Sequence, residues 1–242
     1  MIRLDVHTHC ISSGHGSTCT IADMAKAAQK KGLSLLGISD HGPSTLCAGT
    51  NSYFKNLQMA PKNRYGIEML YGVELNILDY SGKVDLCRHV LKGMDYAIIS
   101  MHTKNIKPGN TLENTNAYIN AMDQPKVRIV GHPDDPKFPV DYKALAEAAK
   151  VKGVMLEINN ASIMPGSYRK DAIPNIIQMM YWAAYYEVPV LLSSDSHGPK
   201  DVGNVKGSLA LLNAYQSILD FPDKLIMNYD IDAFKKALRL DS

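Results

Sequence analysis

The chain has few cysteines and no long apolar run, and both absences restrict what kind of protein it is. Its 242 residues include only four cysteines, Cys10, Cys19, Cys47 and Cys87. None of these stands in a Cys-x-x-Cys spacing, so neither a disulfide framework nor a thiolate zinc site is indicated. No apolar run approaches the roughly 18 residues of a membrane span, and no charged flank with a signal core precedes the first apolar run. We therefore expect a cytoplasmic protein with reduced thiols and no membrane partner.

The chain also lacks a large excess of either positive or negative charge. The formal net charge is only +2, and the Lys and Arg residues are scattered along the chain. Because nucleic-acid binding needs a basic stripe, this composition disfavours a nucleic-acid partner. The chain is 45% apolar without a compositional break, and its length is that of an α/β barrel. We therefore expect a single domain over residues 1–242.

Short apolar runs alternate with helical patterns, which is typical of βα units around a parallel sheet. Seven runs predict strands, at residues 2–7, 35–39, 69–74, 96–100, 128–130, 155–158 and 190–194. Helices are expected at residues 21–31, 112–122, 142–152, 174–186 and 207–214, and after Asp230 to near residue 240. Thr20 and Asp141 are the expected N-caps of two of them, which Gly32 and Gly153 end. Residues 42–62 are expected to form a long loop with one helical turn.

Side chains that bind metals follow the predicted strands. His7 and His9 close the first strand, and because strand side chains alternate, both point to the same side. The carboxyl ends of parallel strands form one face, where ligands bind. One more candidate, His15, follows the first strand. The second, third, fourth, fifth and seventh predicted strands bring further candidates to this face: His41, Glu74, His102, His132, Asp195 and His197. The remaining histidine, His89, is expected at the surface.

The number of candidate ligands indicates more than one metal ion. A catalytic zinc uses about three protein ligands, whereas seven histidines and two carboxylates are present here. Nine groups suit two or three ions, and imidazole with carboxylate suits Zn²⁺, Mn²⁺ or Fe²⁺. Asp5 and Asp40 adjoin the candidates. They either accept the second ring N–H of a histidine or serve in caps and turns.

Five segments together resemble the polymerase and histidinol phosphatase (PHP) family, and the resemblance spans the full chain. They are Asp5-Val6-His7-Thr8-His9, Ile38-Ser39-Asp40-His41-Gly42-Pro43, Gly72-Val73-Glu74, Gly131-His132-Pro133 and Ser194-Asp195-Ser196-His197. Residues 156–160 (Leu-Glu-Ile-Asn-Asn) and the closing segment are similar to the bacterial YcdX-like phosphatases. The resemblance implies an α/β fold, a distorted (β/α)7 TIM-like barrel, with three zinc ions.

The resemblance also implies which residues bind each ion. It assigns His7, His9, Glu74 and Asp195 to one ion, His15, His41 and His197 to a second, and Glu74, His102 and His132 to a third. Glu74 would thus bridge two ions, one with each oxygen. The chain departs from the family in detail over residues 161–174, which contain the basic pair Arg169 and Lys170. This pair is expected either to hold substrate phosphate or to be a solvated surface pair.

A cluster of cations on a concave rim favours a phosphoryl group, whose transition state spreads negative charge over its oxygens. We therefore expect a metal-dependent phosphatase that acts on small-molecule phosphate monoesters, with a metal-bound hydroxide as the nucleophile. The expected catalytic groups are His102, His132, Glu74 and Asp195.

Two other kinds of protein remain as alternatives. One is another metal-dependent hydrolase, either a phosphodiesterase or nuclease, or an amidohydrolase-like enzyme. The absence of a Lys at any predicted strand end disfavours an amidohydrolase, which often carries a carboxylated Lys between two ions. The other is a non-catalytic metal-binding regulatory domain, which the open rim without thiolates disfavours. The sequence leaves the physiological substrate, the general acid and association into a homo-oligomer open.

Overall fold

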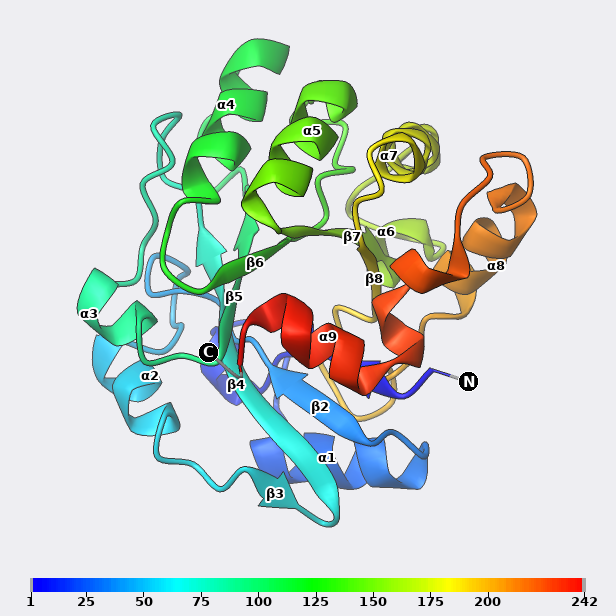
Figure 1. The fold of residues 1–242 in the computed structure, drawn as a ribbon. Helices are drawn as coiled ribbons and strands as arrows, with labels where there is room; N and C mark the ends of the chain where they lie inside the picture. Colours follow the sequence, from blue (N-terminus) through cyan, green and yellow to red (C-terminus); the bar gives the residue numbers. More distant parts are fainter. Residues whose placement is uncertain (1, 241–242) are drawn as a thin grey trace.

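A computed structural model describes residues 2–240 of the protein, and its strands curve into a barrel (Figure 1). Seven strands of the described part are parallel, in the order β1-β2-β4-β5-β6-β7-β8. They are β1 (Leu4–Asp5), β2 (Leu35–Ile38), β4 (Ile67–Asn76), β5 (Tyr96–Ser100), β6 (Val127–Val130), β7 (Met155–Asn159) and β8 (Val190–Ser193). These are the seven predicted strands, and the predicted α/β barrel is confirmed.

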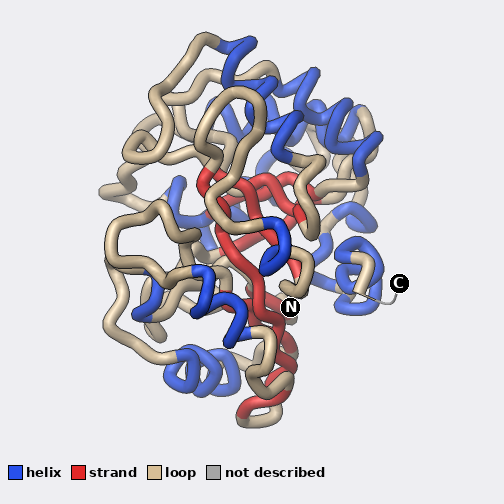
Figure 2. Tube along the Cα trace, turned by 90° about the vertical axis from the view of Figure 1, so that its left-hand side faces the viewer, coloured by secondary structure: helices blue, strands red, loops and turns tan. Residues whose placement is uncertain are grey.

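Helices surround the sheet (Figure 2). They are α1 (Ile21–Lys30), α2 (Asn51–Leu57), α3 (Arg88–Leu91), α4 (Thr111–Ala121), α5 (Tyr142–Lys152), α6 (Asn160–Ile163), α7 (Ile173–Tyr185), α8 (Lys206–Tyr215) and α9 (Ile231–Leu238). The predicted caps are present: Thr20 accepts a hydrogen bond from the backbone N–H of Asp23, and Asp141 caps α5. All six predicted helices form. Their apolar faces are local properties of the sequence, as are the side-chain caps of α1, α4, α5 and α9.

The structure adds elements that the sequence patterns did not predict. Residues 42–62 contain α2, which at 7 residues is longer than the expected single turn. The short strand β3 (Asn63–Arg64) pairs antiparallel with β4, and the two are joined through Tyr65 and Gly66, which both have positive φ. This two-residue strand was not predicted because it has no apolar run. The short helices α3 and α6 were missed as well.

The barrel interior is filled by large side chains and closed at one end by α9. Tyr96 lies across the interior, where a Cβ on Gly37 or Gly72 would meet its side chain at 2.3 or 2.5 Å. Phe234 and Leu238 of α9 pack against an apolar layer formed by Leu4, Val6, Leu35, Leu70, Ile98, Ile129, Met155 and Leu191. Figure 1 looks onto this end, with α9 in front. α9 does not cover the opposite end of the barrel, where the carboxyl ends of the strands lie.

The barrel is distorted at the junction of β1 and β8. At the end near α9, Asn228 of the 3-10 helix η3 (Met227–Tyr229) lies between the two strands. Its side chain donates to the carbonyl of Leu192 (2.7 Å) and to that of Leu4 (3.4 Å). At the other end the chains meet directly, since the N–H of His9 donates to the carbonyl of Ser196 (2.8 Å). This contact brings the segments after β1 and β8 together at the carboxyl ends of the strands.

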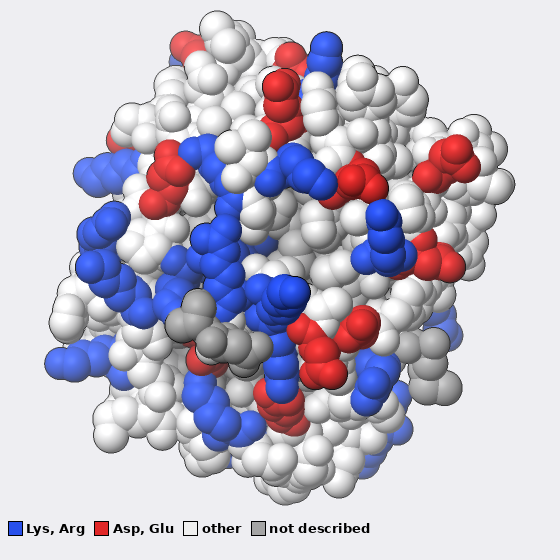
Figure 3. All heavy atoms as spheres, in the orientation of Figure 1, with Lys and Arg blue, Asp and Glu red and all other residues white. Residues whose placement is uncertain are grey.

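The protein has free cysteines and a surface that carries both signs of charge. No helix within the described residues is long and apolar enough to cross a membrane. All four cysteines are free, two of them buried and two exposed. On the face occupied by α9, Lys and Arg side chains gather near the centre, with Asp and Glu beside them (Figure 3). This group of basic residues lies at the other end of the barrel from the carboxyl ends of the strands.

Candidate metal centre

The nine predicted ligands lie together at the carboxyl ends of the strands. Eight of them fall into four groups, each with donor atoms within 4.8 Å of one another. The groups are His7, His9 and Asp195; His7, Glu74 and His132; His41, Glu74 and His102; and His9, His41 and His197. His15 belongs to none of these groups among the described residues, but its ring stacks on that of His41, with 4.8 Å between the centroids. The His15 ring also lies 5.3 Å from that of His197, so His15 lies beside the two histidines with which the family resemblance groups it.

Glu74, at the end of β4, lies at the middle of the cluster and is fully buried. Its Oε1 is 2.8 Å from Nε2 of His132 and 3.5 Å from Nε2 of His102. Its Oε2 is 2.6 Å from Nδ1 of His41 and 3.4 Å from Nε2 of His7. The two oxygens thus face different histidines, which is the arrangement that a carboxylate needs to bridge two ions.

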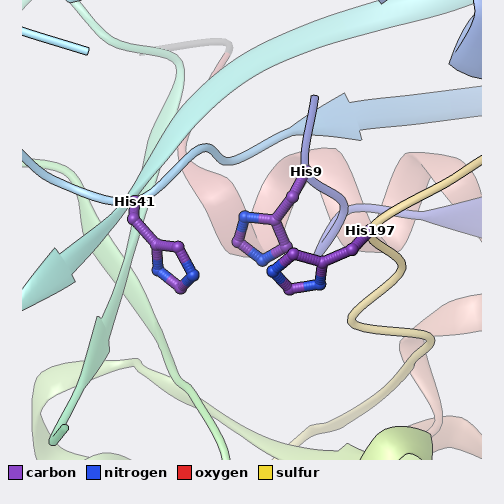
Figure 4. A group of neighbouring side chains, drawn as sticks. All are labelled: His9, His41 and His197. Atoms are coloured by element: carbon purple, nitrogen blue, oxygen red, sulfur yellow. The ribbon is translucent and has the colours of Figure 1, made fainter. Parts of the chain in front are cut away.

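Asp195 and three histidines form the other side of the cluster. Oδ1 of Asp195 is 3.3 Å from Nε2 of His9 and 3.7 Å from Nε2 of His7. Figure 4 shows that His9, His41 and His197 come from three different segments and converge. The ring centroid of His9 is 4.2 Å from that of His197 and 4.5 Å from that of His41. Imidazole rings this close to one another can bind the same cation.

Three of these histidines use their second ring nitrogen to bind a neighbouring side chain. Nδ1 of His7 is 2.5 Å from Oε1 of Glu157, Nδ1 of His9 is 2.8 Å from Oγ of Ser13, and Nδ1 of His102 is 2.8 Å from Oδ1 of Asn76. Carboxylate and amide oxygens are acceptors, so they place the proton on Nδ1 of His7 and His102. Nε2 of each then carries the lone pair that a metal ion requires, and it faces the cluster.

Glu157 is a functional residue that the sequence analysis left unassigned. This buried carboxylate of β7 also accepts a hydrogen bond from the backbone N–H of His132 (2.6 Å) and one from the hydroxyl of Ser193. Asn159 donates a further bond to it (3.1 Å). Glu157 therefore holds two predicted ligands, His7 and His132, in place. The signal available in the sequence was an acidic residue inside an apolar strand, where an unpaired charge is costly.

Asp40 acts on His9 through Ser13 and not by direct contact. The hydroxyl of Ser13 donates to Oδ1 of Asp40 (2.7 Å), which leaves its oxygen to accept from Nδ1 of His9. The backbone N–H of Cys10 (2.7 Å) and the hydroxyl of Tyr53 (2.5 Å) also donate to Asp40. Since Tyr53 belongs to α2, the loop of residues 42–62 is connected to the cluster by hydrogen bonds.

Asp5 does not contact a histidine ring through a hydrogen bond. Its carboxylate accepts from the hydroxyl of Ser194 (2.5 Å) and from the backbone N–H of Gly203 (2.7 Å). Of the two roles considered for Asp5, the structure supports a turn-holding one. It fixes the segment after β8 that carries Asp195 and His197.

The buried atoms of the cluster fit a metal centre. Several of them lack a hydrogen-bond partner among residues 2–240: Nε2 of His7, His9 and His197, both ring nitrogens of His41, Nδ1 of His132 and Oε2 of Glu74. Nδ1 of His41 and Oε2 of Glu74 approach each other, yet without the geometry of a hydrogen bond. Each unsatisfied buried polar atom costs about 1–3 kcal/mol, and the number of them in this one place indicates that a binding partner is missing. A metal cation, which binds imidazole nitrogen and carboxylate oxygen, would be such a partner.

The carboxylates and imidazoles of the cluster shift one another's pKa values. Burial raises the pKa of Glu74, but the imidazoles of His41 and His7 overcome it and hold that pKa well below its usual value. Burial lowers the pKa of His102 to about 4, and burial with the nearby His197 and His41 lowers the pKa of His9. Burial lowers the pKa of His7 and of His41 too, but Glu157 and Glu74 outweigh it at His7 and Glu74 outweighs it at His41, so both pKa values are raised. Because an ionised carboxylate and neutral imidazoles are the forms that bind metal ions, His7 and His41 would release a proton when an ion binds.

Two of the predicted ligands have a backbone conformation that side chains other than glycine rarely adopt. His132 has φ 27° and Asp195 has φ 53°. Such conformations cost of order 1–3 kcal/mol and persist where surrounding contacts impose them, often at functional sites. Here the contacts are the bond from the N–H of His132 to Glu157 and the ion pair between Asp195 and Arg169.

The cluster forms the floor of a cavity of about 600 Å³. Arg169 lines this cavity, and its Nη2 donates to Oδ2 of Asp195 (2.6 Å) and to Oδ1 of Asn159 (3.2 Å). Its Nε donates to the hydroxyl of Ser162 (2.7 Å), so the guanidinium is fixed from three sides. Lys170, the other half of the predicted basic pair, is exposed and does not line the cavity.

Comparison with known proteins assigns the family. The model of the PHP domain matches residues 5–161. A "probable phosphatase" of Clostridium novyi is 38% identical over 94% of this chain and 90% of its own length. Another, of Caldanaerobacter subterraneus, is 39% identical over 98% of this chain and 91% of its own length. The chain belongs to the PHP domain family. The resemblance inferred from the five segments of the sequence is thus confirmed.

A solved structure shares the fold of this PHP domain. The histidinol phosphate phosphatase of Lactococcus lactis, solved with zinc, L-histidinol and phosphate, matches with a TM-score of 0.63 and 15% identity. The match covers 88% of this chain and 93% of that protein. Residues 195 and 197 lie beyond the match to the PHP domain model, yet β8 brings them into the cluster with ligands from within it.

Proposed function

We propose that this chain, a phosphatase of the PHP family like its named relatives, hydrolyses small-molecule phosphate monoesters with a multinuclear metal site, most simply three zinc ions. The observation that carries the proposal is the set of buried, unpartnered donor atoms around Glu74. A zinc-bound phosphatase of the same fold supports zinc, and the donor set equally suits Mn²⁺ or Fe²⁺. The proposal keeps a single catalytic domain without a nucleic-acid or membrane partner.

The residues would divide into three ligand sets, and Glu74 would belong to the first and the third and bridge those two ions. His7, His9 and Asp195 would hold one ion, His41 and His197 with His15 a second, and His102 and His132 a third. When bound, such ions supply Lewis acidity, which activates water near neutral pH and offsets the charge that develops on the phosphoryl oxygens. The catalytic roles proposed for His102, His132, Glu74 and Asp195 are to place that positive charge at the cavity floor.

Arg169 would contribute the substrate contact. Its Nε and Nη2 are occupied by Ser162, Asn159 and Asp195, whereas no bond from a described residue engages Nη1. Because the guanidinium is held in place and lines the cavity, Nη1 offers two N–H donors to an oxyanion without further loss of side-chain entropy. Lys170 points to solvent and is a weaker candidate for this role.

The test is metal-dependent hydrolysis of p-nitrophenyl phosphate. The purified protein is expected to contain tightly bound zinc or a related ion, to lose activity when a strong chelator removes it, and to regain activity when zinc is returned. Full activity in protein shown to be free of metal would contradict the proposal. A metal-saturated protein that hydrolyses no phosphate ester would favour the regulatory alternative.

Substitution of the basic pair tests the substrate contact. Arg169→Met should raise KM for the phosphate ester by about tenfold or more, because a hydrogen bond to a charged group contributes about 1.5–3 kcal/mol. Lys170→Met is the matched control, since it removes the same charge from the adjacent exposed position, and it should leave KM near the wild-type value. Equal effects of the two variants would indicate a general electrostatic effect and not a specific contact.

A further inference from the structure

The cavity extends beyond the metal cluster to a mouth with apolar and aromatic walls. Leu46, in the loop before α2, lines the cavity and is 82% exposed. Tyr168, in the loop before α7, also lines it and is 65% exposed. Met101, after β5, contributes a buried apolar side chain to the wall. Large apolar side chains exposed around a cavity are typical of a surface that a ligand covers.

Tyr168 is fixed by contacts to two other loops at the mouth. Its hydroxyl lies 3.0 Å from Oγ1 of Thr103, in the loop after β5. Nζ of Lys137, in the loop after β6, lies 3.4 Å from the centroid of the Tyr168 ring and donates to its backbone carbonyl (3.0 Å). An exposed ring that is held on one face and at its hydroxyl has lost its freedom before a ligand binds, which favours affinity.

The charges at this mouth do not form a second anion site around Tyr168. The ammonium of Lys137 is already engaged by the carbonyl and ring of Tyr168, and it lies 3.7 Å from the carboxylate of Asp135. Lys104 lines the cavity as well, but it is exposed. The polar groups near the ring therefore hold the ring in place, and the ring itself remains as the binding surface.

Tyr168 directly precedes Arg169, so one segment presents an aromatic ring at the mouth and a guanidinium at the floor. We infer that Tyr168 and Leu46 form a subsite for the leaving group, and that the preferred substrates are phosphate monoesters of alcohols that carry a planar or apolar ring. This inference rests on the proposed function, because it assumes that the phosphoryl group binds at the metal cluster beside Arg169. It assigns Tyr168 a role in specificity.

The test compares 2-phenylethyl phosphate with ethyl phosphate, which differ by one phenyl ring and have leaving alcohols of similar acidity. The wild-type protein should show the higher kcat/KM for 2-phenylethyl phosphate. Tyr168→Ala should lower the ratio of the two kcat/KM values about tenfold, mainly through KM, since an aromatic contact contributes about 0.5–1.5 kcal/mol beyond its buried area. Leu46→Ala should lower the ratio by a smaller factor.

Two further variants separate recognition from structural support. Tyr168→Phe keeps the ring but loses the contact with Thr103, and it should retain most of the wild-type ratio. Tyr181→Ala removes a tyrosine that is exposed on α7 and does not line the cavity, and it should leave the ratio unchanged. If Tyr168→Ala slows both substrates equally, or the wild type does not prefer the ring, the subsite is refuted while the phosphatase stands. If the metal-loaded wild type hydrolyses neither ester, the proposed function fails and the inference with it.

Discussion

Replacing Glu157 by Gln tests whether the buried carboxylate under the cluster prepares the metal ligands. Its Oε1 lies 2.5 Å from Nδ1 of His7, and its Oε2 accepts the backbone N–H of His132 at 2.6 Å. A glutamine of the same shape has one acceptor oxygen, so its NH₂ group must face one of these two N–H donors. Either orientation leaves a donor opposite a donor in a fully buried place.

The expected loss follows from these contacts. A hydrogen bond to a charged group contributes about 1.5–3 kcal/mol, and partners of metal-binding histidines typically contribute 10–100-fold in metal affinity. We expect Glu157→Gln to weaken zinc binding by about 10–100-fold. The fold should persist, since the apolar layers of the barrel do not depend on this carboxylate.

Competition with a chromophoric chelator measures the zinc affinity of the variant, and circular dichroism checks its fold. Glu147→Gln is the matched control, because Glu147 lies on α5 and the cluster does not contain it. Wild-type zinc affinity in a folded Glu157→Gln variant would refute the view that Glu157 orients His7. A loss of affinity in Glu147→Gln of the same size would refute it as well.

Two more predictions concern other buried contacts. Ser13→Ala should lower zinc affinity by about tenfold, a smaller loss than that of Glu157→Gln, because it removes a neutral hydrogen-bond acceptor from Nδ1 of His9. The same chelator competition measures this affinity. An unchanged affinity would show that Ser13, and Asp40 through it, does not orient His9. Burial raises the pKa of Asp134 from 3.8 to about 6, so the folded metal-free protein binds this proton more tightly than the unfolded chain, and stability falls as pH rises from about 4 to about 6. Urea unfolding should show Asp134→Asn gaining up to about 3 kcal/mol relative to wild type over that window, and parallel pH curves for the two would contradict the assignment.

The convergence of the predicted ligands could be foreseen from the sequence because their positions follow from local rules. Apolar runs mark the strands, alternation places His7 and His9 on one side, and parallel strands end on one face. Each predicted ligand can therefore be identified from the sequence around it, without knowledge of the residues that it contacts in the fold. The helices were predictable for a similar reason, since caps such as Thr20 and Asp141 lie next to the helices that they begin.

Most of the supporting contacts were not predictable, because they join residues far apart in the chain; the contact of Ser13 with His9, four positions away, is the exception. His7 and Glu157 are 150 positions apart, and Ser13 reaches Asp40 across 27 positions. Only packing decides which of many polar residues near a strand end becomes the partner of a given imidazole. For the same reason the sequence placed Arg169 and Lys170 together as a basic pair, whereas the fold turns one into the cavity and the other to solvent.

The strand that supplies no ligand explains how the ligands are held. The sequence patterns leave β7 (Met155–Asn159) without an assigned role, because no predicted ligand follows it. Its Glu157 binds His7 and the backbone of His132, its Asn159 binds Asp195, and the loop after α6 brings Arg169 to Asp195. β4 and the segment after β2 each carry a predicted ligand together with a supporting residue, Asn76 and Asp40 respectively, whereas β7 contributes supporting residues alone. β7 therefore supports the predicted ligands, and its own polar residues belong to none of the groups of described residues that could hold an ion.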